Sequence, residues 1–136
     1  MSGLSGGCLC GAIKYDLQGE PLMTAICHCK DCQKQTGTTF SIVVGVTPES
    51  VKVDGKATIY TTVGETGAEV HRHFCSLCGS PILSDATASM GIYFIKAGTL
   101  DDTSNLKPEL EIFRDDAQSW CDLSGDWKKA ARNPEM

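Results

Sequence analysis

The stretch AICHCKDCQ (residues 25–33) places three cysteines within six residues. Residues two apart on a strand point to the same face, so Cys27 and Cys29 can approach one ion while His28 points away. Cys29 and Cys32 have the two-residue gap of a zinc knuckle, where a tight turn brings two thiolates to one metal. This stretch therefore predicts a metal site with three thiolate ligands, and the alternation argues against His28 as a fourth.

Four more cysteines form two pairs, Cys8-Leu9-Cys10 and Cys75-Ser76-Leu77-Cys78, and Cys121 stands alone. A structural zinc takes four ligands in a closed tetrahedron, and grouping the two pairs around one ion leaves no ligand over. Such a site would close a loop of roughly 65 residues, which matters for the stability of a small β domain. We therefore predict a structural zinc at Cys8, Cys10, Cys75 and Cys78, and we interpret Cys121 as a small core residue.

The three-cysteine cluster then has an open fourth position, which is typical of a zinc that meets water or a substrate. Three other interpretations remain open. The cysteines could form disulfides, although Cys-x-Cys pairs bridge poorly. One zinc with several spare thiols is also possible, and so is a purely structural second site closed by His28 or by a distant residue.

Length and composition favour one globular domain over residues 1–136, with 41% hydrophobic and 21% charged residues. The formal charge of −5 and the lack of a basic stripe argue against nucleic acid and anionic membranes as partners. There is no run of eighteen apolar residues and no basic-then-apolar leader at the start of this sequence. We expect a cytoplasmic protein whose cysteines serve metal or redox chemistry, and no pattern indicates an oligomeric state.

Short apolar runs between glycine-rich turns predict a mainly β protein with small helical pieces. The alternation in residues 12–17 buries Ile13, Tyr15 and Leu17 on one face of a strand. Further strands are expected at residues 22–29, 40–46, 51–53, 58–63, 69–74, 81–83, 91–97 and 110–113, with an Asp54-Gly55 turn between the third and fourth of these strands. One helical turn is predicted at residues 30–35, ended by Thr36-Gly37, and a longer helix at residues 117–132.

Three motifs in this order resemble the glutathione-dependent formaldehyde-activating enzyme family, also called centromere-protein-V-like. They are GCLCGAIKY (residues 7–15), CHCKDCQK (residues 27–34) followed by TG and FS, and FCSLCGSP (residues 74–81), with a weaker match at Ser119-Trp120 and Leu123. The resemblance implies a β-tent-like fold with antiparallel strands and two zinc ions. It implies a structural zinc at Cys8, Cys10, Cys75 and Cys78 and a catalytic zinc at Cys27, Cys29 and Cys32.

The resemblance also implies a zinc-dependent carbon–sulfur lyase that joins glutathione and formaldehyde into S-hydroxymethylglutathione, or cleaves such adducts. A zinc with three thiolates is a weak Lewis acid toward water but takes a soft thiol well, which agrees with that activity. His28 and His73 are candidates for a general acid, and Lys30 and Lys34 for attracting an anionic ligand. The alternative is a non-catalytic, zinc-stabilised binding module. A zinc deaminase is disfavoured because its H-x-E and P-C-x-x-C motifs are absent.

Overall fold

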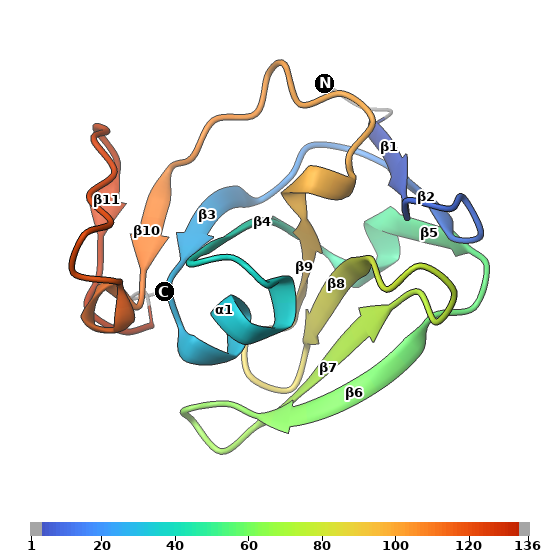
Figure 1. Ribbon diagram of the computed structural model, residues 1–136. Coiled ribbons are helices and arrows are strands. Elements are labelled where there is room, and N and C mark those ends of the chain that lie inside the picture. The colour runs from blue at the N-terminus through green and yellow to red at the C-terminus, as the bar shows by residue number, and fades with distance from the viewer. Residues whose placement is uncertain (1–3, 134–136) are drawn as a thin grey trace.

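The alternating stretch that includes Tyr15 forms the central strand of a small antiparallel sheet in the computed structural model, which describes residues 4–133 (Figure 1). This sheet has the order β1 (Leu4–Gly7), β2 (Lys14–Leu17) and β5 (Val51–Asp54). Ile13, Tyr15 and Leu17 are buried, while Lys14 and Asp16 are exposed. The prediction of a half-buried strand is confirmed.

The remaining strands form one eight-stranded sheet with the order β11-β10-β3-β4-β9-β8-β7-β6. Its strands are β3 (Met23–Cys27), β4 (Ser41–Val46), β6 (Thr58–Val63), β7 (Glu69–Phe74), β8 (Pro81–Ala86), β9 (Ile92–Lys96), β10 (Leu110–Ile112) and β11 (Lys128–Lys129). All neighbours pair antiparallel except β10, which runs parallel to both β3 and β11. The prediction of a mainly β fold with antiparallel strands is therefore confirmed. The short helical pieces are α1 (Lys30–Thr36), η1 (Pro48–Ser50), η2 (Ala97–Thr99) and η3 (Arg114–Asp116).

The main core lies between the small sheet and one face of the large sheet. Tyr15 and Leu17 of β2 pack in one cluster with Val44 of β4, Leu83 of β8 and Ile95 of β9. Burying such side chains contributes about 1.5–3 kcal/mol each, so this interface carries much of the stability. The opposite face of the large sheet is left free to carry a site.

Helix α1 begins directly after the second cysteine of the opening motif. The thiol of Cys29 caps it by accepting a hydrogen bond from the Cys32 N–H at 3.3 Å, and Asp31 places a negative charge in its first turn. The helix ends at Gly37, whose φ of 75° lies in the left-handed region that glycine adopts readily. The predicted turn and its end at Thr36-Gly37 are confirmed.

The predicted helix over residues 117–132 is wrong. The tail instead pairs with β10 through β11 and continues along the same edge, where the Ala130 N–H donates to the Glu111 carbonyl at 2.8 Å and the Phe113 N–H donates to the Arg132 carbonyl at 3.1 Å. Strand β10 offers unpaired backbone groups at this edge, and satisfying them outweighs a helical preference already interrupted by Gly125.

The strands on either side of Asp54-Gly55 exist, but β5 joins the small sheet and β6 the edge of the large one. The prediction of one domain over residues 1–136 extends past the described residues and stays a prediction. No helix among residues 4–133 has the length and apolar character needed to cross a membrane.

Candidate metal centres and the adjoining pocket

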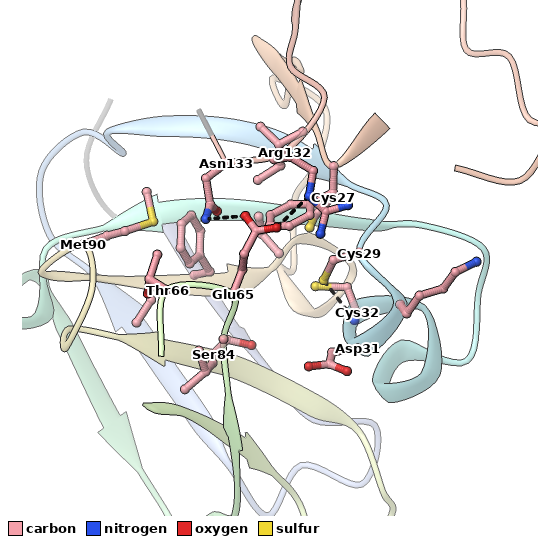
Figure 2. A pocket seen from close by; sticks show the side chains of 18 of the residues that line it. Cys27, Cys29, Asp31, Cys32, Glu65, Thr66, Ser84, Met90, Arg132 and Asn133 are labelled. Atoms are coloured by element: carbon pink, nitrogen blue, oxygen red, sulfur yellow. Dashed lines mark hydrogen bonds and ion pairs between the residues drawn. The ribbon is translucent and has the colours of Figure 1, made fainter. Parts of the chain in front are cut away.

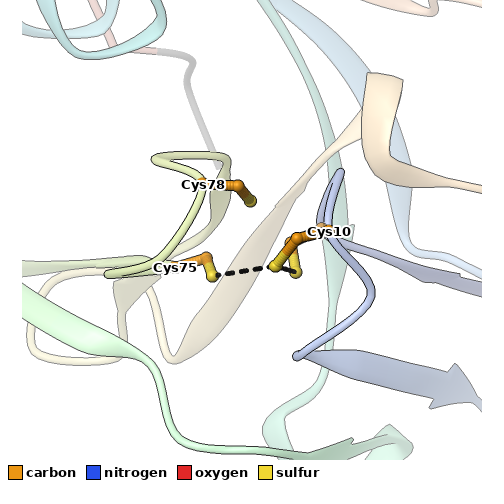
Figure 3. A group of neighbouring side chains, drawn as sticks. Cys10, Cys75 and Cys78 are labelled. Atoms are coloured by element: carbon orange, nitrogen blue, oxygen red, sulfur yellow. Dashed lines mark hydrogen bonds between the residues drawn. The ribbon is translucent and has the colours of Figure 1, made fainter.

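Four cysteines from two distant turns converge beside the small sheet. Cys8 and Cys10 come from the β1–β2 connection, and Cys75 and Cys78 come from the β7–β8 connection (Figure 3). All four sulfur atoms lie within 4.8 Å of one another, with Cys8 and Cys10 at 3.7 Å and Cys10 and Cys75 at 3.8 Å. This donor set fits a closed four-thiolate metal site.

Backbone and hydroxyl groups around this cluster favour negatively charged sulfur. The Ile13 N–H donates to the Cys8 sulfur at 3.2 Å, and the Ser80 hydroxyl lies 3.2 Å from the Cys78 sulfur. Hydrogen bonds from the side chain and backbone of Ser80 lower the pKa of Cys78 to about 5. Such surroundings suit thiolate ligands, which must be deprotonated to bind a metal.

The other three clustered cysteines meet where β3 ends and α1 begins. Cys27 is the last residue of β3, Cys29 caps the helix and Cys32 lies in its first turn. Their sulfur atoms lie within 4.8 Å of one another, and among residues 4–133 this group contains no fourth histidine, cysteine or carboxylate. Cys27 and Cys32 are buried, whereas Cys29 is partly exposed. The donor set therefore fits a metal with three protein ligands and an open position.

His28 turns away from these three sulfur atoms, as the strand alternation predicts. Its Nε2 lies 2.6 Å from Oε2 of Glu111 on β10, and both side chains are 0% exposed. The same carboxylate accepts from Arg114 at 2.9 Å and from the Trp127 indole at 2.8 Å. Burial raises the pKa of Glu111, but these hydrogen bonds outweigh it and leave the pKa lowered. The network holds His28, and with it the backbone between Cys27 and Cys29, against β10.

Glu111→Ala is expected to destabilise the fold by about 3–5 kcal/mol, because it leaves the buried partners of the carboxylate unpaired. Urea unfolding of the metal-loaded protein measures this loss. Glu109→Ala is the matched control, since Glu109 is exposed just before the same strand, and it should cost less than about 1 kcal/mol. Equal midpoints for the two variants would show that the network does not support the site.

A cavity of about 320 Å³ opens beside the three cysteines, over the face of the large sheet that the small sheet leaves free (Figure 2). Its apolar wall includes Val43, Phe94, Ile112 and Phe113. Arg132 joins the tail to the β6–β7 turn at the rim, at 2.7 Å from Glu65, and also pairs with Asp116 at 3.4 Å. The cysteine sulfurs thus adjoin a largely apolar space large enough for a small molecule.

Two buried cations share this cavity with the cysteines. Arg72 of β7 and Lys96 of β9 both line it and are 6% and 5% exposed. Hydrogen bonds from Cys27 and Cys29 lower the pKa of Cys32 well below its usual range, and the charges of Lys96 and Arg72 lower it further, against the effect of burial. The cavity therefore stabilises negative charge next to the three sulfurs.

Three of the four other sequence candidates lie outside the cavity. His28 and His73 do not line the cavity, and Lys34 lies on the exposed side of α1, while Lys30 does line the cavity. Sequence reasoning did not assign a role to Arg72, Ser84 or Lys96, which do line it. The signal that could have found them is a polar residue in a strand that is otherwise apolar on both faces, clearest for the lysine that ends IYFIK (residues 92–96).

Comparison with known proteins agrees with this geometry. The family model described as "Glutathione-dependent formaldehyde-activating enzyme" matches residues 3–116. The crystal structure of a Rhodobacter sphaeroides protein is similar, with a TM-score of 0.57 and 21% sequence identity over 71% of this chain and 87% of that chain. At this identity the likeness shows the fold alone. The comparison with curated proteins gave no match.

Proposed function

This chain belongs to the glutathione-dependent formaldehyde-activating enzyme family, and we propose that it is a carbon–sulfur lyase acting on a small thiol and an aldehyde. Glutathione and formaldehyde are the first-choice substrates. In this proposal Cys8, Cys10, Cys75 and Cys78 hold a structural zinc. Cys27, Cys29 and Cys32 hold a second, catalytic zinc.

One observation carries the proposal: three clustered sulfurs, which no fourth histidine, cysteine or carboxylate joins within residues 4–133, adjoin a cavity. Sulfur donors suit zinc, and the donor count matches a catalytic site, which keeps one position for a ligand from outside. When bound, zinc would accept the sulfur of an incoming thiol as its fourth ligand and favour the thiolate form.

The protein's own residues would place the reactants. Cys27, Cys29 and Cys32 fix where the thiol sulfur enters, and the apolar wall formed by Val43 and Phe94 excludes water from the reacting atoms. In the reaction a bond forms between the thiol sulfur and the aldehyde carbon, and the thiol proton ends on the former carbonyl oxygen as a hydroxyl. The product is a hemithioacetal, and the reverse reaction releases the thiol and the aldehyde without any redox change.

The proposal is tested with protein that carries cobalt in place of zinc. Adding glutathione should increase the thiolate-to-cobalt absorption, because a fourth sulfur joins the three from the chain. S-Methylglutathione, which has no free thiol, is the control and should leave the spectrum unchanged. Two metals per chain are expected. One metal per chain, with no response to glutathione, would instead favour a zinc-stabilised binding module.

A further inference from the structure

Arg72 and Ser84 occupy directly opposed positions on neighbouring strands of the cavity floor. The register pairs Arg72 of β7 with Ser84 of β8, so their side chains share one face of the sheet. Both residues line the cavity and are 6% exposed. Within residues 4–133, Nη1 of Arg72 and Oγ of Ser84 are buried and have no hydrogen-bond partner. Two neighbouring residues of the cavity lining therefore each carry an unpaired donor.

The rest of the Arg72 side chain is held in place. Its Nε donates to the Thr62 hydroxyl at 3.1 Å, and its Nη2 lies 4.0 Å from the Asp31 carboxylate, which is half exposed at the start of α1. Leaving a buried donor unpaired costs about 1–3 kcal/mol, and more when it is charged. A guanidinium held in place with one unpaired nitrogen is thus suited to donate a hydrogen bond to a ligand's oxygen atom.

The charges that line the cavity favour an anion. Glu65 and Asp116 are both paired with Arg132 at the rim. Lys96 donates to the Ser41 hydroxyl at 3.1 Å and, within residues 4–133, has no carboxylate within 4.0 Å. Among residues 4–133 the one carboxylate paired with these two buried cations is Asp31, which is half exposed and 4.0 Å from Arg72. Burying an incompletely paired charge is costly, so a ligand that brings a negative charge is preferred over a neutral one.

We propose that Arg72 and Ser84 bind a carboxylate of the thiol substrate, with Lys96 adding favourable charge, so that the site selects thiols that carry a carboxylate. Ser84 lies on a strand across the cavity from helix α1, which carries Cys32 (Figure 2). One molecule could therefore place its sulfur at the cysteines and its carboxylate at these donors. This inference rests on the proposed function, because it assumes that the sulfur goes to the three-cysteine centre.

The test compares N-acetylcysteine with N-acetylcysteine amide, which lacks only the carboxylate charge, by calorimetric titration of the zinc-loaded protein. The acid should bind roughly 10-fold or more tightly than the amide, as expected for hydrogen bonds to a charged group. In Arg72→Gln the ratio of the two affinities, acid over amide, should fall to near 1. The two thiols differ in acidity, but that difference cancels when wild type and variant are compared. Lys34→Gln removes one positive charge outside the cavity and should keep the preference.

Ser84→Ala is a second variant that changes the fold little, because it removes only a hydroxyl. It should lower the preference for the acid by roughly 3-fold, the worth of one ordinary hydrogen bond. If Arg72→Gln is well folded and keeps the full preference, the inference is overturned. If Arg72→Gln does not fold, an unchanged preference in Ser84→Ala overturns it and a reduced one supports it.

N-Acetylalanine, which has the carboxylate but no thiol, separates this inference from the proposed function. Binding that depends on Arg72, with no change in the cobalt spectrum on adding N-acetylcysteine, would leave the carboxylate site standing and refute the thiol chemistry. If N-acetylcysteine and its amide change the cobalt spectrum equally, in both wild type and Arg72→Gln, the thiol chemistry stands and the carboxylate site is refuted.

Discussion

Cys78→Ser is expected to abolish the cooperative fold. The four-cysteine cluster joins the β1–β2 connection to the β7–β8 connection, and Cys10 and Cys75 are 65 residues apart in the sequence. A structural zinc contributes about 10–16 kcal/mol of apparent binding free energy, which is as large as the whole stability of a typical domain. Circular dichroism during heating should show no native transition, and metal analysis should show zinc lost from this site.

Cys121→Ser is the matched control for this change. It makes the same substitution at a partly buried cysteine outside both clusters, and it should keep the metal content and shift the melting temperature by only a few degrees. A Cys78→Ser protein that melts like Cys121→Ser and retains its full zinc content would contradict a structural role for the four-cysteine site.

The two cysteine clusters could be grouped from the sequence because metal ligands have local spacing rules. A Cys-x-x-Cys knuckle constrains its own geometry, and the assignment of Cys8 and Cys10 with Cys75 and Cys78 follows from counting ligands. Cys8 and Cys10 lie in a turn after β1 rather than on extended backbone. The structure brings these four sulfurs together. The alternation around Tyr15 is equally local, and the burial of that strand face was predictable for the same reason.

The features that the sequence did not predict depend on pairing between distant segments. His28 contacts Glu111 across 83 residues, and Arg72 stands beside Ser84 only because of the β7–β8 register. Local periodicity says which face a residue takes but not which strand lies opposite. The prediction of a helix over residues 117–132 was wrong for the same reason. Helical propensity depends on local sequence and does not report that the distant edge of β10 has backbone groups to pair.

Cys32→Ser is expected to remove the second zinc and all activity while leaving the fold nearly unchanged. Cys32 packs in a small cluster with Cys27, Ile112 and Phe113 at the end of the large sheet, apart from the main core. With two sulfurs left, the site should bind metal too weakly to fill, so formation of S-hydroxymethylglutathione from glutathione and formaldehyde should fall to the uncatalysed rate. Proton NMR of the mixture measures that rate, and metal analysis should give about one zinc per chain.

The contrast between the two cysteine variants tests the division of labour between the sites. Cys32→Ser should keep a cooperative thermal transition within several degrees of wild type, because the four-cysteine site and the core between the two sheets are intact. A chelator should also remove zinc from the three-cysteine site of the wild type first, because an open site exchanges its metal faster than a closed one. If Cys32→Ser unfolds as completely as Cys78→Ser, both metals are structural, and the three cysteines are not a catalytic centre.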